Sequence, residues 1–163
     1  MKQYIGTKQV SATPMTKAEY NEYRNWDLSE DEDGTEEGYL VEYEDSNPNH
    51  PNHKGYISWS PKKQFDDAYN SINEMTFGHA VVLAMNGHKV ARKGWNGKDM
   101  WIIFTPGRTV QNLEPNSFYE KSGFIPPVTI NGHFDMKAAD GSMVVGWLAS
   151  QTDIVARDWT VVV

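Results

Sequence analysis

The stretch Thr76-Phe-Gly-His-Ala-Val-Val-Leu-Ala-Met-Asn-Gly87, followed by Lys89-Val-Ala-Arg-Lys93, decides the expected fold. Thr76 is a favourable helix N-cap, and apolar residues from Phe77 to Ala84 recur with the spacing of one helical face. The Asn86-Gly87 pair is typical of a helix that ends in a left-handed residue. Because strand-like residues come next, the pattern predicts a helix that packs on a sheet formed by the segments that follow.

The rest of the second half is expected to supply that sheet. Asn96-Gly97 and Asp140-Gly141 are turn pairs that tolerate positive φ, so each predicts a hairpin. The predicted strands are residues 89–93, 100–105, 132–139, 142–148 and 159–163, with a short helix opened by a Ser150–Asp153 capping box. Residues 106–127 are expected to be irregular, with one helical turn near Phe118. The predicted fold class is α+β, an antiparallel β-sheet with a helix packed on one face.

The first half, residues 1–74, is predicted to be an accessory α+β module with an acidic loop. Its predicted strands are residues 4–12, 38–43 and 55–59. Its predicted helices run to about Tyr23 after a Thr16–Glu19 capping box, and to about Ile72 after Ser60-Pro61. Residues 27–37 hold seven carboxylates and no basic side chain, which favours a solvated loop.

The composition argues against a DNA-binding protein, a membrane-spanning protein and a secreted protein. Residues 1–75 carry 15 acidic and 7 basic side chains, and residues 76–163 carry 7 and 8, within a net charge of -7. Duplex nucleic acid normally needs a basic face, so we expect no DNA partner. No apolar run approaches the roughly 20 residues of a membrane span, and Met1–Lys8 lacks the apolar centre of a signal peptide. We therefore expect a cytoplasmic protein that does not enter the membrane.

The usual signatures of catalysis and of metal binding are missing. The chain has no cysteine, and its five histidines are scattered. Gly94-Trp-Asn-Gly-Lys98 has a glycine and a lysine but not the spacing of a phosphate-binding loop. Asp153 and Asp158 lie five residues apart near a helix end, where capping explains the first of them. We expect no catalytic residue, no metal site and no cofactor.

Groups suited to binding are better represented, beginning with Trp95. It is one of six tryptophans, and it lies in a turn, where an indole can stack on a purine or fold back over its own sheet. Arg92, Lys93 and Lys98 bracket that turn and suit a phosphate, although cations also protect strand edges. Ala149-Ser-Gln-Thr-Asp153 offers hydroxyl, amide and backbone N–H groups at a helix N-terminus. We expect Trp95 to be exposed, so Trp95→Ala should abolish ligand capture with little loss of folded stability.

Several separated motifs resemble the phage Thoeris anti-defence 2 family. They are Met75-Thr-Phe-Gly-His-Ala80, Lys89-Val-Ala-Arg-Lys-Gly-Trp-Asn-Gly-Lys98, Met136-Lys-Ala-Ala-Asp-Gly141, Gly146-Trp-Leu-Ala-Ser-Gln-Thr-Asp153 and Asp158-Trp159, all within residues 75–163. The resemblance implies a ligand-binding domain over those residues. It further implies a homotetramer that sequesters glyco-cyclic ADP-ribose, a signal made by TIR-domain immune enzymes, without cleaving it. Some members also capture cyclic di- or trinucleotides of cGAS-like (CBASS) systems.

The resemblance and the residue chemistry together give one candidate ligand site. Its residues are Trp95, Asn96, Lys98, Trp147, Ser150, Gln151, Thr152 and Asp153. Trp95 and Asn96 are expected to contact a nucleoside face, and Ser150 to Asp153 a ribose or a phosphate. Compact family members lack a counterpart of residues 1–74. Two alternative functions stay open. The first is a module that binds a protein through its acidic first half, and the second is a hydrolase of the same signals.

Overall fold

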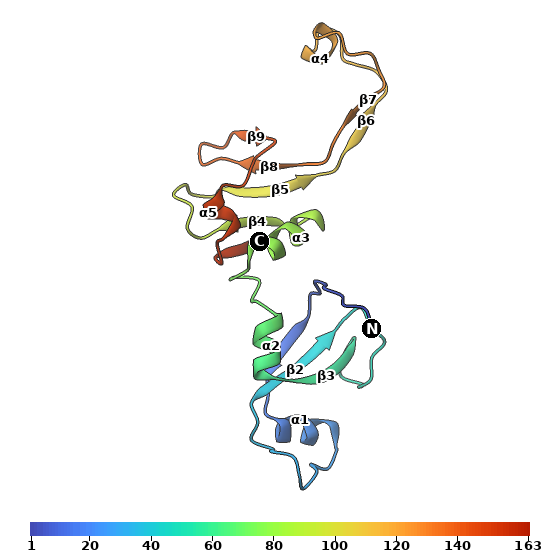
Figure 1. The fold of residues 1–163 in the computed structure, drawn as a ribbon, viewed down its shortest axis with the longest axis vertical. Helices are drawn as coiled ribbons and strands as arrows, with labels where there is room; N and C mark the ends of the chain where they lie inside the picture. The colour runs from blue at the N-terminus through green and yellow to red at the C-terminus, as the bar shows by residue number, and fades with distance from the viewer. The chain divides into compact units, whose positions relative to one another are not determined.

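One main antiparallel sheet organises each of the two units of the chain, and the second unit also holds a separate two-stranded sheet (Figure 1). The computed structural model describes all residues, Met1–Val163, and the units are Met1–Asn70 and Ser71–Val163. Both units mix helices with antiparallel strands, which confirms the predicted α+β class. No helix in the chain combines the length and the apolar character needed to cross a membrane.

The first unit is a three-stranded sheet with a helix on each face. Its elements are β1 Ser11–Pro14, α1 Lys17–Arg24, β2 Gly38–Tyr43, β3 Tyr56–Pro61 and α2 Lys62–Ala68, with strand order β1-β2-β3. On one face Tyr20 of α1 packs on Leu40 and Ile57. On the other face Phe65 of α2 stacks on Tyr39 at a ring separation of 4.1 Å.

Local signals predicted this unit well except at two places. The Thr16–Glu19 capping box is present, and residues 27–37 contain no helix or strand. Residues 4–10 are not a strand, because β1 pairs with β2 only from Ser11 onward. The second helix begins at Lys62, because Pro61 still pairs with Gly38 in the sheet and Ser60 makes no capping bond. It ends at Ala68, short of the predicted Ile72, because the next residue, Tyr69, has an extended backbone.

The second unit is built on a five-stranded sheet with α3 packed on one face. Its elements are α3 Phe77–Met85, β4 Lys89–Arg92, β5 Trp101–Thr105, β6 Arg108–Val110, α4 Phe118–Lys121, β7 Val128–Ile130, β8 His133–Lys137, β9 Met143–Val145, α5 Gln151–Ile154 and β10 Trp159–Val162. The strand order is β10-β4-β5-β8-β9, antiparallel throughout. The buried core between α3 and the sheet is Met75, Ala80, Ala84, Val90, Ile102, Met136 and Trp159.

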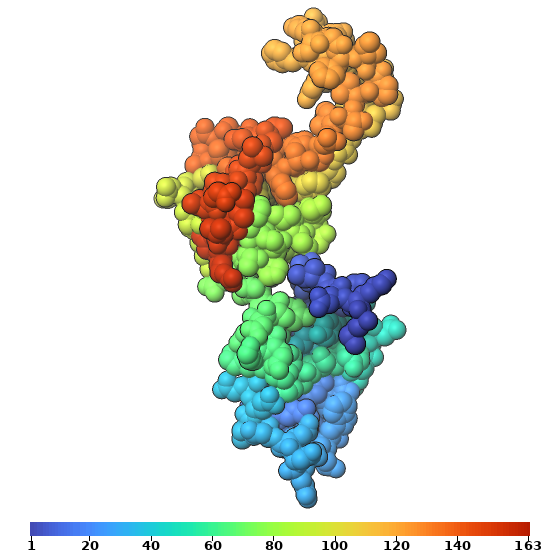
Figure 2. All heavy atoms as spheres, in the orientation of Figure 1, coloured from blue at the N-terminus to red at the C-terminus, as the bar shows by residue number.

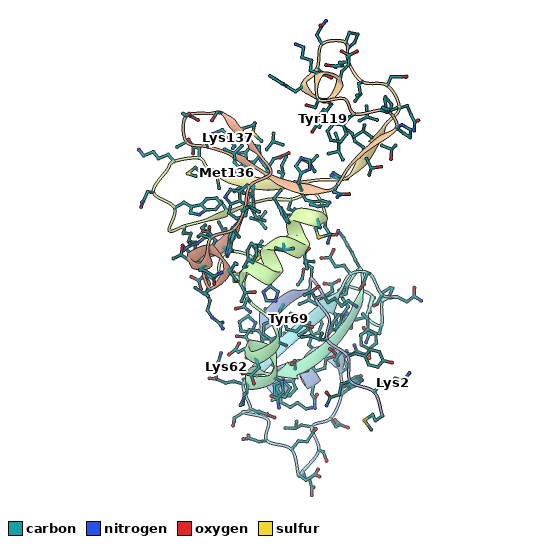
Figure 3. All side chains as sticks on the ribbon, turned by 45° about the horizontal axis from the view of Figure 1, so that its top comes forward. Lys2, Lys62, Tyr69, Tyr119, Met136 and Lys137 are labelled. Carbon is teal, nitrogen blue, oxygen red and sulfur yellow. The ribbon has the colours of Figure 1, made fainter.

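The side chains of β8 show how the two faces of this sheet differ. Met136 lies in the core under α3, whereas its neighbour Lys137 points to the other face and donates to the backbone oxygen of Asp99 (Figure 3). The helix is capped as predicted, because the Thr76 hydroxyl accepts from the N–H of His79. Gly87 follows the helix with a φ of 94°.

One edge of the sheet is covered by the segment that opens the unit. Met75 and Trp159 exchange two backbone hydrogen bonds of 2.8 and 3.2 Å. Farther along β10, the N–H of Val161 donates to the carbonyl of Ile72. The strand β10 therefore has a backbone partner on both sides.

Residues 106–131 form a projection that we call the arm (Figure 2). Its strands β6 and β7 pair from Arg108–Ile130 to Val110–Val128, and α4 lies near its end. The helical turn near Phe118 was expected, but the two-stranded ribbon was not. The arm continues the β5–β8 pair, and strands of three residues are too short to show a period of two. Phe118 at 89% and Ile125 at 84% are exposed on the arm, which also carries Tyr119 (Figure 3).

Candidate functional site

Two distant segments of the second unit meet at one end of the sheet. Trp95, in the connection between β4 and β5, donates its indole N–H to Asp153 Oδ1 over 3.0 Å. The Trp95 ring also meets Trp147 edge to face, with centroids 6.1 Å apart. These segments, residues 94–98 and 147–153, hold all eight predicted ligand residues, and together we call them the rim. The structure thus brings the sequence-predicted candidates into one place.

Trp95 does not stand at an exposed hairpin tip as the sequence suggested. Neither Asn96 nor Gly97 takes positive φ, and Asp99 does so instead, at 55°. The connection is therefore an eight-residue loop, residues 93–100, and not a tight two-residue turn. Within it the half-buried indole folds back against Trp147 and the fully buried Trp159. Only part of the indole is therefore accessible to a ligand.

Asp153 is the buried acceptor around which the rim is arranged. Its Oδ1 accepts from Trp95 and from Arg92, each over 3.0 Å, and its Oδ2 accepts from the N–H of Ser150 at 3.0 Å and its hydroxyl at 2.6 Å. Burial raises the pKa of Asp153, but these hydrogen bonds outweigh it and lower the pKa to about 2. A carboxylate has about four acceptor positions, so Asp153 has none left for a ligand.

The short helix that follows Ser150 confirms a local prediction and limits another. The Ser150–Asp153 capping box is present, and α5 is a single turn of four residues. Because the Asp153 N–H is bound by Ser150, and because one turn has a weak dipole, the helix N-terminus offers little to an anion. A ligand contact in this segment falls instead to the exposed side chains of Gln151 and Thr152.

The three cations near the loop differ in their availability. Arg92 is held by two carboxylates, Asp153 and Asp158, with its side chain 16% exposed. The Lys93 ammonium lies 3.8 Å from Glu74 Oε1, in a long ion pair. Lys98 is exposed and forms no ion pair. The sequence did not predict that Arg92 binds both Asp153 and Asp158, although the five-residue spacing of these two aspartates is apparent in it.

Several rim groups are free to meet a ligand. Asn96 and Lys98 are exposed, and the half-buried Trp147 makes no side-chain hydrogen bond. Together with Trp95, which contacts Trp147, they offer an aromatic surface, an amide and an ammonium group on the two segments of the rim. Such a set can stack on a base, pair with its polar edge and neutralise a phosphate.

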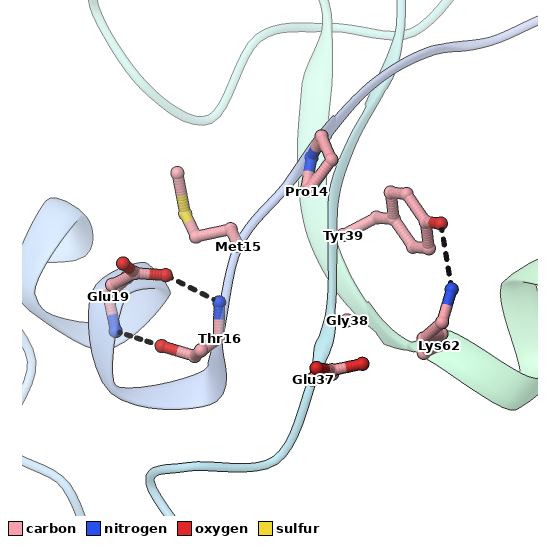
Figure 4. A pocket seen from close by; sticks show the side chains of 8 residues that line it. All are labelled: Pro14, Met15, Thr16, Glu19, Glu37, Gly38, Tyr39 and Lys62. Carbon is pink, nitrogen blue, oxygen red and sulfur yellow. Dashed lines mark hydrogen bonds between the residues drawn. The ribbon is translucent and has the colours of Figure 1, made fainter.

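Two pockets lie in the first unit, and neither is lined by a rim residue. The first, about 360 Å³, is lined by Pro14, Met15, Thr16, Glu19, Glu37, Gly38, Tyr39 and Lys62 (Figure 4). Its Glu19 carboxylate caps α1, and its Lys62 ammonium binds Asp66 at 2.9 Å. Most of its polar groups thus serve local structure. No group of three or more potential metal ligands is present in the chain.

Comparison with known proteins agrees with the motif positions. The family model for the Thoeris anti-defense 2-like domain matches residues 75–162. A curated protein named Thoeris anti-defense 2, from Bacillus phage SP01, is 32% identical over 89 residues, which are 55% of this chain and 96% of that protein. The matched region contains the helix α3, the whole five-stranded sheet and the rim. The resemblance read from the sequence is thereby confirmed, and the chain belongs to the Thoeris anti-defense 2-like domain family.

Proposed function

We propose that this protein counters a bacterial defence by binding a cyclic nucleotide immune signal and withholding it from its effector. The first candidate ligand is glyco-cyclic ADP-ribose made by TIR-domain enzymes, and cyclic di- or trinucleotides of cGAS-like systems are the second. The site of action is the cytoplasm of the infected host. The observation that carries the proposal is the rim. There Trp95 and Trp147 pack against each other, and the exposed Asn96 and Lys98 supply an amide and an ammonium group.

Binding without cleavage suits the rim better than hydrolysis. Hydrolysis of a phosphodiester or glycosidic bond calls for a general acid or base free to exchange a proton with the substrate. The rim carboxylate Asp153 is fully engaged, and its pKa of about 2 keeps it ionised at neutral pH. Asp158 is likewise bound to Arg92 and to the N–H of Gly94. Both carboxylates act as acceptors within the protein.

The proposed ligand site lies between copies of the chain, in a homotetramer. A competitor of an immune effector needs an affinity near the nanomolar range, about -12 kcal/mol. Ligands held so tightly are usually enclosed on most of their surface. The rim of one copy offers one aromatic edge and a few side chains, which can cover only one side of a nucleotide. A second copy related by symmetry supplies the opposite wall.

Calorimetric titration of the full chain with glyco-cyclic ADP-ribose tests the proposal. We expect saturable binding with a fixed number of sites per tetramer, and recovery of the intact nucleotide after heat denaturation. Asn96→Ala and Lys98→Ala should weaken binding, whereas Lys121→Ala on the arm is a matched control that should not. Recovery of a cleaved product would make the protein a hydrolase. A monomer that binds none of the candidate signals would refute the proposal.

A second candidate function is protein binding by the first unit. It is favoured by the exposed loop Asp27–Glu37, which carries seven carboxylates and no cation. Such a loop can imitate a nucleic acid or dock on a basic host factor. The test is to replace these carboxylates by amides in the full chain and to measure how well the variant protects an infecting phage from the bacterial defence. Loss of protection with signal binding intact would favour this second function.

A further inference from the structure

Arg92 links the two halves of the rim. It is the last residue of β4, where it pairs with Trp159 in the sheet. Its guanidinium donates through Nη1 to Asp153 Oδ1 over 3.0 Å, and through Nε to Asp158 Oδ1 over 2.9 Å. The longer contact from Nη2 to Asp158 Oδ2, 3.4 Å, makes the second pair two-pronged. All three nitrogens of the side chain therefore have a carboxylate partner.

Through Asp158 this network fixes the start of the 93–100 loop. Asp158 Oδ2 accepts from the N–H of Gly94 over 2.7 Å, and its backbone oxygen accepts from the N–H of Lys93 over 3.1 Å. A Cβ at position 94 would come within 2.7 Å of Asp158 Oδ2 and 3.2 Å of Arg92 Nη2. Only glycine fits this approach without displacing the ion pair. The backbone enters the loop on a path that the guanidinium and its partner define.

Through Asp153 the same guanidinium fixes the orientation of Trp95. Arg92 and the Trp95 indole share one carboxylate oxygen, Asp153 Oδ1. Rotation of that carboxylate would break both bonds at once. The other oxygen holds Ser150, so the turn before α5 depends on the same group. The free side chains of the rim are thus displayed by two segments anchored on one arginine.

The charge balance argues against Arg92 as a phosphate ligand. One guanidinium faces two carboxylates, which leaves this cluster with a local charge of about -1, and three of the five guanidinium N–H groups already bind those carboxylates. A phosphate placed there would displace a buried ion pair and face the carboxylates. The cation in the rim that is free for an anion is the exposed Lys98.

We infer that Arg92 is a positioning residue, which sets the ligand-binding geometry of the rim through Asp153 and Asp158 and does not itself touch the ligand. This inference rests on the proposed function for its affinity readout. It also has a readout that needs no ligand, namely the indole N–H resonance of Trp95 in a ¹⁵N-labelled full chain. That resonance can be assigned by its disappearance in Trp95→Phe.

The test uses Arg92→Lys, which keeps the charge but cannot bridge both carboxylates. We expect the Trp95 indole resonance to shift or broaden, the resonances of Trp26 and Trp59 to stay in place, and affinity for glyco-cyclic ADP-ribose to fall about tenfold or more. The exposed Arg157→Lys is the matched control and should change neither readout. Lys98→Ala should lower affinity and leave the resonance in place.

Each other outcome overturns the inference or isolates the proposed function. If Arg92→Lys weakens binding with an unmoved Trp95 resonance, Arg92 contacts the ligand and the inference is wrong. If it binds as tightly as the parent, positioning by Arg92 is unnecessary and the inference is equally wrong. If Arg92→Lys does not fold, Asp158→Asn replaces it, with a smaller shift and loss expected in the same direction. If the parent binds no signal, the proposed function fails, and the resonance alone decides whether Arg92 positions Trp95.

Discussion

Replacement of Trp95 by alanine should destabilise the second unit as well as impair the rim. The indole N–H bonds to the buried carboxylate of Asp153, and a hydrogen bond to a charged group contributes about 1.5–3 kcal/mol. The ring also meets Trp147 and Trp159 edge to face, each worth about 0.5–1.5 kcal/mol beyond its buried area. Since the side chain is only half-buried, we expect a total loss of about 3 kcal/mol.

Urea unfolding of the full chain, followed by far-ultraviolet circular dichroism, measures this loss. With a denaturant slope of about 2 kcal/mol per molar, the midpoint of the second unit should fall by about 1.5 M. Trp95→Phe keeps an aromatic edge but loses the donor, so about half of the loss should remain. A Trp95→Ala midpoint equal to that of the parent would show that the indole is free in solution. The arrangement of the rim around Asp153 would then be wrong.

Three further perturbations probe other parts of the chain. The pKa of Asp153, about 2 in the folded state against 3.8 for an ordinary aspartate, means that its ionised form stabilises the fold above about pH 4. That contribution, about 2 kcal/mol, should be lost as the pH falls from 4 to 2, and a chain with Asp153→Asn should lack this part of the acid-induced loss in urea titrations. Thr76→Ala removes the cap of α3 and should lower the stability of the second unit by about 1 kcal/mol, whereas Thr76→Ser should retain most of it, as thermal melts can check. Gly55→Ala places a Cβ on the carbonyl oxygen of Tyr43, so the first unit should lose about 3 kcal/mol or more; a near-parental melt would contradict the close approach of Gly55 to the end of β2.

Elements with a local signature could be predicted from the sequence. Both capping boxes, at Thr16 and Ser150, form as expected, because the cap and its partner are three residues apart and need no distant contact. The α3 helix follows from its cap, its apolar face and Gly87. The β8–β9 hairpin likewise turns at Gly141, which takes a φ of 90°.

Features that depend on distant contacts could not be predicted. Asn96-Gly97 has a strong preference for a tight hairpin turn, but hydrogen bonds to Asp153 and Asp158 pull the loop over the sheet instead. The same contacts turn Trp95 inward. Their residues lie about 60 positions away along the chain, so only the folded structure joins them. Residues 4–10 show the converse, since a segment predicted to be a strand forms none without a partner to pair with.

Within the rim, the structure gives different roles to residues that the sequence could not tell apart. Residue type alone makes Asp153 and Arg92 plausible ligand contacts, because each could serve a sugar hydroxyl or a phosphate. Their burial and mutual pairing are tertiary facts. Asn96 and Lys98 carry no such commitment, and they remain the candidates with the most freedom to bind.

The covered edge of β10 has a practical consequence for anyone who excises the domain that the family model matches. The family match begins at residue 75, but Ile72 and Asn73 still bond to the final strand. A fragment that begins at residue 75 would leave the N–H of Val161 without a partner and would expose part of the β10 edge. Exposed strand edges pair with strands of neighbouring molecules, so such a fragment would tend to aggregate. Cutting before Ser71 keeps the protective segment in place.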